Sequence, residues 1–241
     1  IDRNTDLKLV SKRIVWGKFL NSGQTCVAPD YLIVHKSIKG TLIKELIDRI
    51  EQTFDKNFDN TSDITAIVNE KNFNRLTELI KENKIIYGGK SDRENRYIFP
   101  TIIDSPKMDS NIMKEEIFGP ILPVLSFEKL EDIDDIINKN PNPLALYVFS
   151  NDKKFTDTVI NRYSFGGGSI NDTIVHLANS RLPFGGIGNS GIGSYHGKLS
   201  FELFSHKKSI VNRSTWFDNN LRYAPYKNKL SLVRKLMKYL G

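Results

Sequence analysis

The chain has 241 residues, of which 39% are hydrophobic and 26% are charged, enough for the core of one large domain or one and a half. No segment is apolar over the length of a membrane span, and a single cysteine excludes an internal disulfide, so we expect a reducing, cytoplasmic compartment. Residues 206–241 hold nine of the 35 Lys and Arg but one of the 28 acids, so the net charge of +7 belongs to the tail. The nearly neutral body argues against a nucleic-acid binder.

The hydrophobic pattern alternates between helical and strand spacing along the chain. Leu7, Val10 and Ile14 predict a helix over 5–20, and a β-rich run predicts a strand over 31–35. Further helices are expected at 39–58, 69–82, 130–138 and 155–163, and further strands at 85–87, 97–103 (interrupted at Pro100), 121–127 and 144–149. The glycines at 166–168 are expected to break the chain before 169–171. This alternation predicts an α/β fold, a mostly parallel sheet with helices on both faces.

The last part of the chain has a different composition from the body. We place the domain at 1–208 and a basic C-terminal tail at 209–241, irregular at first and ending in an amphipathic helix. In that helix Arg234, Lys235 and Lys238 lie largely off the apolar stripe. Docking on its own protein or on a sister subunit is the favoured interpretation. Contact with an anionic membrane surface is the alternative.

Cys26 lies in a small polar turn between the first predicted helix and the first strand. A thiol in such a turn can be reached by a substrate, and nearby backbone N–H groups can stabilise negative charge on a bound intermediate. On these residues alone, a cysteine packed like a small hydrophobe is the commoner interpretation.

Gly186, Gly188 and Gly191 have the spacing of a dinucleotide-binding fingerprint. The motif follows Leu182–Phe184 rather than a strand and lies late in the chain, so we reject that interpretation. A flexible or tightly turned loop, using glycine for positive φ and able to pass close to a substrate, is favoured.

The segment 115–120 combines two glutamates, a phenylalanine and a Gly-Pro turn ahead of a strand. A carboxylate there could accept hydrogen bonds from sugar hydroxyls, and the aromatic ring could cover a ligand ring. A surface pair of glutamates before a turn is an equal alternative. The four histidines have no metal-ligand spacing, so no metal is expected; a Cys–His dyad is conceivable, but nothing selects its histidine.

Taken together, these motifs resemble those of the aldehyde dehydrogenase family, most closely its class 3 branch. The likeness runs nearly end to end and is carried by Trp16–Tyr31, Glu115–Pro123, Ser169–His176 and Leu182–Lys198. Four ordered motifs at family-like separations favour the functional interpretation of Cys26 over the packing one.

The resemblance implies a role for each of these residues. Cys26 looks like the catalytic nucleophile, whose thiolate adds to an aldehyde; hydride passes to NAD or NADP, and water hydrolyses the resulting thioester to a carboxylic acid. The Cys26 backbone N–H would form part of the oxyanion hole. Glu116 looks like the ligand of the nicotinamide ribose and Phe118 like the residue beside the nicotinamide. Asn171, His176 and Phe184 would lie near the substrate entrance.

The family's Rossmann-type cofactor domain and the E-L-G-G-K stretch with its general base are not in this sequence. Together with a first residue that is not methionine, this leads us to expect the catalytic domain plus tail of a longer enzyme. The alternative is an inactive truncated or split fragment. The expected partners are a small-molecule aldehyde, a second copy in a homodimer, and a separately encoded or missing N-terminal half. We expect the chain alone to bind the dinucleotide poorly and to be inactive.

Overall fold

A computed structural model describes residues 1–54, 63–226 and 229–240. The chain divides into two compact units, Ile1–Phe204 and Ser205–Gly241, and each is considered by itself. The first unit contains the sheets and all the motifs discussed above. The end of the helix expected over 39–58 falls partly outside the described residues.

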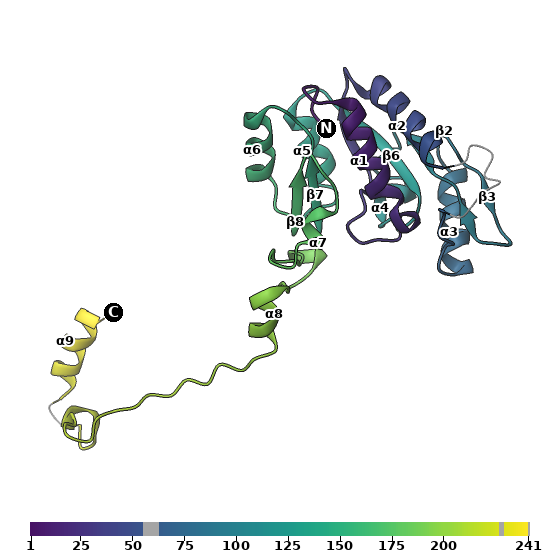
Figure 1. Ribbon diagram of the computed structural model, residues 1–241. Helices are drawn as coiled ribbons and strands as arrows, with labels where there is room; N and C mark the ends of the chain where they lie inside the picture. Colours follow the sequence, from purple (N-terminus) through teal and green to yellow (C-terminus); the bar gives the residue numbers. More distant parts are fainter. Residues whose placement is uncertain (55–62, 227–228, 241) are drawn as a thin grey trace. The chain divides into compact units, whose positions relative to one another are not determined.

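The main sheet of the first unit has four strands in the order β1-β6-β5-β2. Figure 1 labels β6 and β2 among them. These are β1 Leu32–His35, β6 Ile121–Phe127, β5 Thr101–Asp104 and β2 Ile85–Tyr87. β1 and β5 both run parallel to β6, with Leu32 opposite Val124 and Thr101 opposite Ile121. β2 pairs antiparallel with β5. The expected α/β fold with a mostly parallel sheet is therefore confirmed, with an antiparallel strand at one edge.

Two smaller pairs of strands complete the described β-structure. β7 Ala145–Val148 and β8 Gly167–Ile170 pair in parallel, whereas β3 Ser91–Asp92 and β4 Tyr97–Ile98 are antiparallel. The interruption expected at Pro100 separates β4 from β5. The break expected at 166–168 is wrong, because Gly167 and Gly168 belong to β8. A Cβ on Gly168 would lie 1.9 Å from the Leu146 carbonyl oxygen, so the two strands approach there as only glycine permits.

Helices cover both faces of the main sheet, and the alternation of strand side chains builds a core on each. α1 Leu7–Phe19 and α2 Lys39–Thr53 pack over Ile102, Leu122 and Val124. α3 Glu70–Lys81 and the short α4 Asn111–Lys114 pack over Ile103, Ile121 and Leu125 on the opposite face. Successive strand residues point to opposite faces, which explains why β6 is apolar along nearly its whole length.

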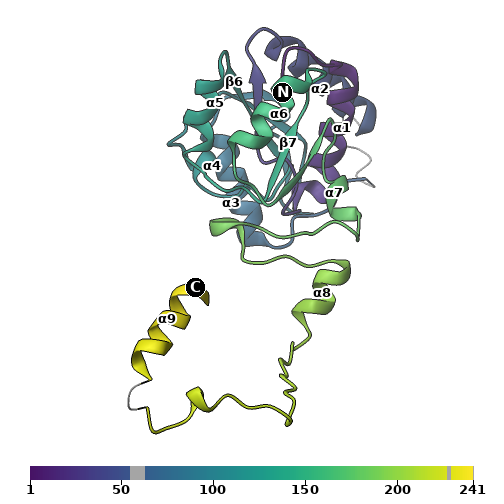
Figure 2. The same ribbon diagram turned by 90° about the vertical axis from the view of Figure 1, so that its left-hand side faces the viewer.

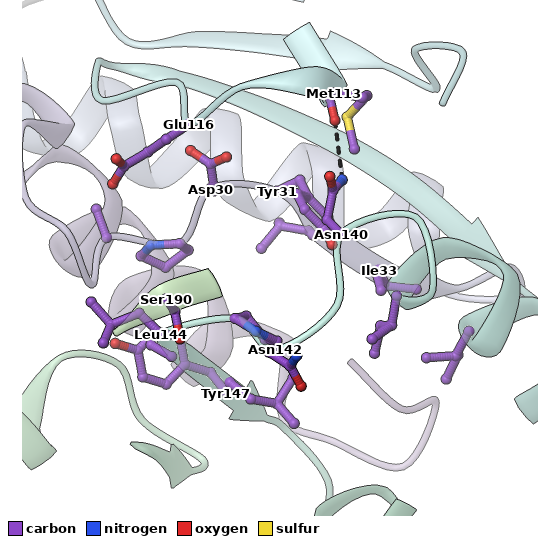
Figure 3. A pocket seen from close by; sticks show the side chains of 18 of the residues that line it. Asp30, Tyr31, Ile33, Met113, Glu116, Asn140, Asn142, Leu144, Tyr147 and Ser190 are labelled. Atoms are coloured by element: carbon purple, nitrogen blue, oxygen red, sulfur yellow. Dashed lines mark hydrogen bonds between the residues drawn. The ribbon is translucent and has the colours of Figure 1, made fainter. Parts of the chain in front are cut away.

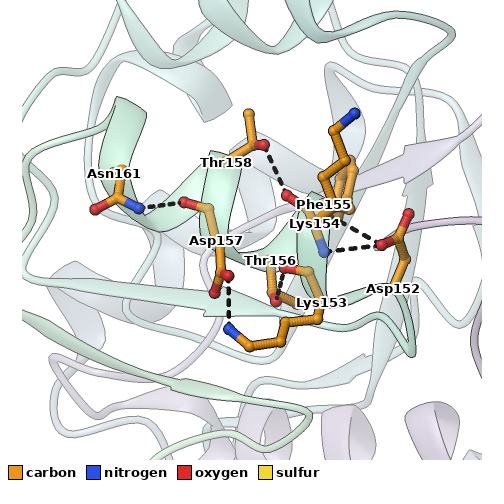
Figure 4. A network of polar contacts seen from close by, with 8 residues as sticks. All are labelled: Asp152, Lys153, Lys154, Phe155, Thr156, Asp157, Thr158 and Asn161. Carbon is orange, nitrogen blue, oxygen red and sulfur yellow. Dashed lines mark hydrogen bonds and ion pairs between the residues drawn. The ribbon is translucent and has the colours of Figure 1, made fainter.

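Side-chain caps set the starts of three helices. Asp6 and Asn69 accept backbone N–H groups at the starts of α1 and α3. Asp152 does the same for α6 Lys153–Arg162, where Lys153 also pairs with Asp157 at 2.6 Å (Figure 4). A capping carboxylate satisfies N–H groups of the first turn. The helix expected at 155–163 therefore begins two residues earlier.

The remaining elements are short or belong to the second unit. α5 Leu130–Ile137 packs through Ile133 and Ile137 beside Phe127. The connecting segments contain four short elements: η1 Leu20–Gly23, α7 Val175–Ala178, η2 Gly188–Ser190 and α8 Gly197–Leu203. Figure 2 shows the first unit from a second side. The second unit contains η3 Asn220–Arg222 and α9 Leu230–Leu240, the expected terminal helix. None of the helices in the described part of the chain has the length and apolar content of a membrane span.

Candidate active site

Cys26 lies on a loop that is fixed at several points, and its side chain is exposed. The loop leaves α1 through Asn21 and Ser22, both at φ 52°, and Gly23 at φ 71°. Ser22 Oγ donates to the Thr65 carbonyl oxygen at 2.6 Å. The side-chain amide of Gln24 contacts the same segment twice. It donates to the Ala66 carbonyl oxygen at 3.1 Å and accepts from the Val68 N–H at 2.9 Å. These hydrogen bonds hold the backbone of the loop in place, and the Cys26 thiol is exposed rather than packed in the core like a small hydrophobe.

Tyr147 of β7 fixes the other side of the loop. Its hydroxyl donates to the carbonyl oxygen of Val27, the residue after Cys26, at 2.7 Å. Burial raises the pKa of Tyr147, and the nearby Cys26 adds to that effect. Nothing in the local sequence singles out Tyr147, because its partner is 120 residues away.

The turn containing Glu116 and Phe118 contacts the start of the Cys26 loop. A Cβ on Gly23 would lie 2.3 Å from the Gly119 carbonyl oxygen, so the two backbones meet there. Arg75 of α3 holds the turn, donating to the carbonyl oxygens of Ile117 at 2.6 Å and Glu116 at 3.4 Å. The structure therefore brings the turn with the two residues predicted to bind the cofactor against the start of the loop that carries the predicted nucleophile.

A buried lysine and two carboxylates form the charged part of the site. Lys18 of α1 is 1% exposed, and burial lowers its pKa to about 8 against the opposing attraction of Asp30 and Glu116. Burial raises the pKa of Asp30, although Lys18 and the Ile117 N–H, 3.1 Å from Asp30 Oδ1, favour its charged form. Desolvation and Asp30 together raise the pKa of Glu116, with Lys18 and Arg75 opposing them.

Cys26, Asp30 and Glu116 line a cavity of about 710 Å³. Figure 3 shows the Asp30 and Glu116 side chains close to each other, with Tyr147 and Ser190 also on the lining. Ser190 belongs to the glycine-rich loop, which is tightly turned: a Cβ on Gly186 would lie 2.2 Å from the Ser190 carbonyl oxygen. The favoured tight-turn interpretation of this loop is thereby supported, and the loop reaches the cavity that contains the thiol.

The three residues predicted at the substrate entrance are packed rather than open. The Asn171 amide accepts from the Ser150 N–H at 2.8 Å and donates to the Ser150 carbonyl oxygen at 2.9 Å. His176 is 6% exposed, neither ring nitrogen has a hydrogen-bond partner, and burial lowers its pKa. Its ring lies 5.7 Å from that of Tyr147 and 6.1 Å from that of Phe184.

Phe184 is buried with Val27 and Ile174. His176 and Phe184 therefore lie behind the Cys26 loop, and their role at an entrance stays a prediction. Within the described residues no group of three or more His, Cys, Asp or Glu side chains could hold a metal ion.

The geometry defines an α/β domain with a presented thiol beside an acidic and aromatic turn, and comparison with known proteins identifies the family. The family model "Aldehyde dehydrogenase family" matches residues 1–210. This chain belongs to the aldehyde dehydrogenase family, a family of oxidoreductases. The resemblance seen in the sequence is thereby confirmed.

Individual relatives agree with this assignment. A 4,4'-diaponeurosporen-aldehyde dehydrogenase of Staphylococcus aureus is 47% identical over 99% of this chain and 52% of its own length. A mouse protein named aldehyde dehydrogenase, dimeric NADP-preferring, is 43% identical over 95% of this chain and 51% of its own length. The substrate-bound structure of Staphylococcus aureus AldH matches with a TM-score of 0.87 at 47% identity, covering 98% of this chain and 52% of that one. The chain thus spans about half the length of the curated relatives it matches.

Proposed function

We propose that this chain supplies the nucleophile and part of the cofactor site for NAD(P)-dependent oxidation of an aldehyde to a carboxylic acid. The observation that carries the proposal is the contact between the fixed Cys26 loop and the Glu116–Gly119 turn. The proposal is supported further by the exposed Cys26 thiol and the Glu116 carboxylate, which line the same cavity, and by the exposed Phe118 ring two residues after Glu116.

In this proposal the Cys26 thiolate adds to the aldehyde carbon and the carbonyl oxygen becomes an oxyanion, which the Cys26 backbone N–H stabilises. Loss of hydride from that carbon leaves a thioester on Cys26, and water releases the acid and restores the thiol. NAD or NADP supplies the hydride acceptor when it is bound.

The residues present fit the nicotinamide end of such a dinucleotide. The Glu116 carboxylate reaches solvent at the cavity and would accept hydrogen bonds from the ribose hydroxyls. Phe118, held at φ 49° and 38% exposed, would lie beside the nicotinamide ring. Arg75 orients both by holding the backbone between them.

Protection of Cys26 from alkylation tests this assignment. The purified chain is treated with iodoacetamide, with and without an aldehyde in excess, and alkylation is followed by peptide mass mapping. Reversible addition of the aldehyde to Cys26 should slow its alkylation, and Cys26→Ser should show no labelled peptide. A rate that the aldehyde does not change, or a thiol that reacts as slowly as a buried one, would contradict the assignment.

The second candidate is a fragment that folds but does not turn over. It is favoured by the match to only about half of each relative, and by the absence from this sequence of the family stretch with the general base. Water attack on the thioester needs such a base. We therefore propose that the chain alone shows little or no NAD(P)-dependent aldehyde oxidation; sustained production of reduced dinucleotide by the purified chain would overturn this.

We also propose that the chain forms a homodimer in which α9 docks on its own subunit or on the sister subunit. The mouse relative is named dimeric, and α9 exposes Leu232, Leu236 and Met237. Removing residues 230–240 should lower the assembly mass measured by sedimentation. Unchanged mass combined with loss of binding to anionic vesicles would instead support the membrane alternative.

A further inference from the structure

The peptide between Val27 and Ala28 closes the turn that carries Cys26, and both of its polar groups are hydrogen-bonded. The Ala28 N–H donates to the Thr25 carbonyl oxygen at 3.0 Å, the bond that defines a β-turn. The Val27 carbonyl oxygen of the same peptide accepts from the Tyr147 hydroxyl at 2.7 Å. The orientation of this peptide therefore depends on where the Tyr147 ring lies.

The His176 ring confines the Tyr147 ring. The two ring centroids are 5.7 Å apart with 63° between the planes, an edge-on contact. His176 is 6% exposed and also packs against Phe184, with 6.1 Å between the centroids. A Cβ on Gly167 of β8 would lie 3.1 Å from His176 Cδ2, so the strand backbone closes a further side of the imidazole. The His176 ring is thus held by its neighbours and supports Tyr147.

The backbone that leads to His176 is held in a strained conformation. Ile174 has φ 62°, which is exceptional for a β-branched residue. Next to it, Thr173 Oγ1 donates to a carbonyl oxygen of α1 at 2.9 Å, and a Cβ on Gly17 would lie 2.2 Å from Oγ1. Strain of this kind persists only where the surroundings over-determine the backbone. The fold therefore fixes the position of His176.

Neither ring nitrogen of His176 has a hydrogen-bond partner, and both are buried. A neutral imidazole in this place leaves polar atoms unsatisfied, but an imidazolium would in addition bury a charge, which costs far more. Burial accordingly lowers the pKa of His176 from its ordinary 6.5. The neutral ring is therefore the form that packs against Tyr147 at pH 7.

The titratable and charged groups around His176 do not favour its protonation. They comprise Tyr147 of β7 with Cys26 near it, Tyr195 and His196 in ring contact with Phe184, and the ion pair of Asp172 with Arg13 of α1, while β8 contributes glycine backbone. Burial raises the pKa of Tyr147, so its hydroxyl is neutral, and the Asp172 carboxylate is already paired at 3.8 Å. A proton on His176 is therefore accommodated by movement of the ring out of its packing. This movement begins as pH falls below 6.5, because the released ring binds the proton that the packed ring resists.

We propose that His176 is a positioning residue whose neutral ring, acting through Tyr147, holds the peptide after Val27 and with it the turn that carries Cys26. Below pH 6.5 the ring leaves its packing and the turn loosens. Acyl transfer to Cys26, which rests on the proposed function, then slows because the Cys26 backbone N–H is no longer aimed at the oxyanion. The thiol itself stays reactive toward reagents that form no oxyanion.

Two thiol reagents separate the position of the turn from the ionisation of the thiol. p-Nitrophenyl acetate acylates Cys26 through an oxyanion, whereas dipyridyl disulfide exchanges with the same thiolate without one. The ratio of the acylation rate to the exchange rate therefore cancels the thiolate fraction. In the parent chain this ratio should fall at least about fivefold between pH 7.5 and pH 5.5, a part of what loss of an oxyanion donor costs.

Two variants at His176 assign this fall. His176→Ala removes the ring, so the ratio should be low at both pH values. His176→Phe keeps an apolar ring that takes up no proton, so it should restore what His176→Ala loses and make the ratio independent of pH. His35→Phe is the matched control, because the His35 ring also packs edge-on against an aromatic ring, that of Phe127, and it should retain the parent's fall. A His176→Phe variant with the parent's pH-dependence would overturn the proposal.

Amide hydrogen exchange tests the same link without thiol chemistry. The protection factor of the Ala28 N–H is its exchange rate relative to that of an unstructured peptide at the same pH. Measured with Cys26→Ser, this protection should fall at least about fivefold from pH 7.5 to pH 5.5, and it should not fall when His176→Phe is added. Tyr147→Phe breaks the link and should make the protection low at both pH values, which serves where a His176 variant does not fold.

An equal loss of protection in β6 would indicate general destabilisation and overturn the proposal, as would an Ala28 amide that does not respond to pH. Absence of acylation in every variant would contradict the proposed function alone. The Ala28 amide would then decide whether His176 holds the turn.

Discussion

Removing the charge of Lys18 should change how stability depends on pH. The unfolded side chain titrates near 10.5, whereas burial lowers the folded pKa to about 8. Between these values the unfolded state binds the proton and the folded state does not, so stability rises with pH across this window. Below about pH 8 the folded state carries the full cost of the buried charge. The difference between the two pKa values corresponds to roughly 3 kcal/mol.

The assay is urea unfolding at constant salt from pH 7 to pH 10.5, for the parent and for Lys18→Met. Subtracting the free energy of unfolding of one protein from that of the other cancels the contribution of groups that titrate alike in both. Between about pH 8 and 10.5, the free energy of unfolding of the parent should rise by roughly 3 kcal/mol relative to that of Lys18→Met. Lys12→Met, on the exposed face of the same helix, is the control and should follow the parent. A difference that is flat with pH would refute the reasoning about the buried lysine.

Two further predictions concern hydrogen bonds. Tyr147→Phe removes the hydrogen bond to the Val27 carbonyl oxygen and should lower the free energy of unfolding by about 1–2 kcal/mol in urea titrations. The control variant Tyr97→Phe should lower it by less. Equal losses would contradict a stabilising role for the Tyr147 hydrogen bond. Lys39 and Lys84 hold the pKa of Asp104 at about 2, so its stabilisation is present above the unfolded value of 3.8 and is lost as pH falls toward 2. Asp104→Asn should therefore cost about 1 kcal/mol at pH 7 after solvent screening, and little at pH 2; a loss independent of pH would refute this.

The sequence predicted most elements of the first unit, because their apolar spacing and their caps are local. β6 was placed at its observed bounds, and α3 differs from its predicted range only by the residues that cap it. The start of α6 was missed because Asp152 caps it before its apolar stripe begins. The glycines of β8 were misassigned because what they accommodate, the carbonyl oxygen of Leu146, belongs to another strand.

The charged part of the site was only partly predictable. Lys18 lies four residues after Ile14, on the buried face of α1, and a lysine in an apolar stripe could have been selected for that reason. Asp30 and Tyr147 carried no such pattern. Their roles depend on the Ile117 N–H and the Val27 carbonyl oxygen, which are distant in the chain. Only the fold brings these groups together.

The measurement that most directly tests Cys26 as the nucleophile is acylation by p-nitrophenyl acetate, which needs neither a dinucleotide nor a general base for deacylation. We predict a burst of p-nitrophenolate approaching one per chain and an acetyl group mapped to Cys26, followed by slow release. Cys26→Ser should show neither. A parent chain without a burst, or with the acetyl group on another residue, would contradict the account.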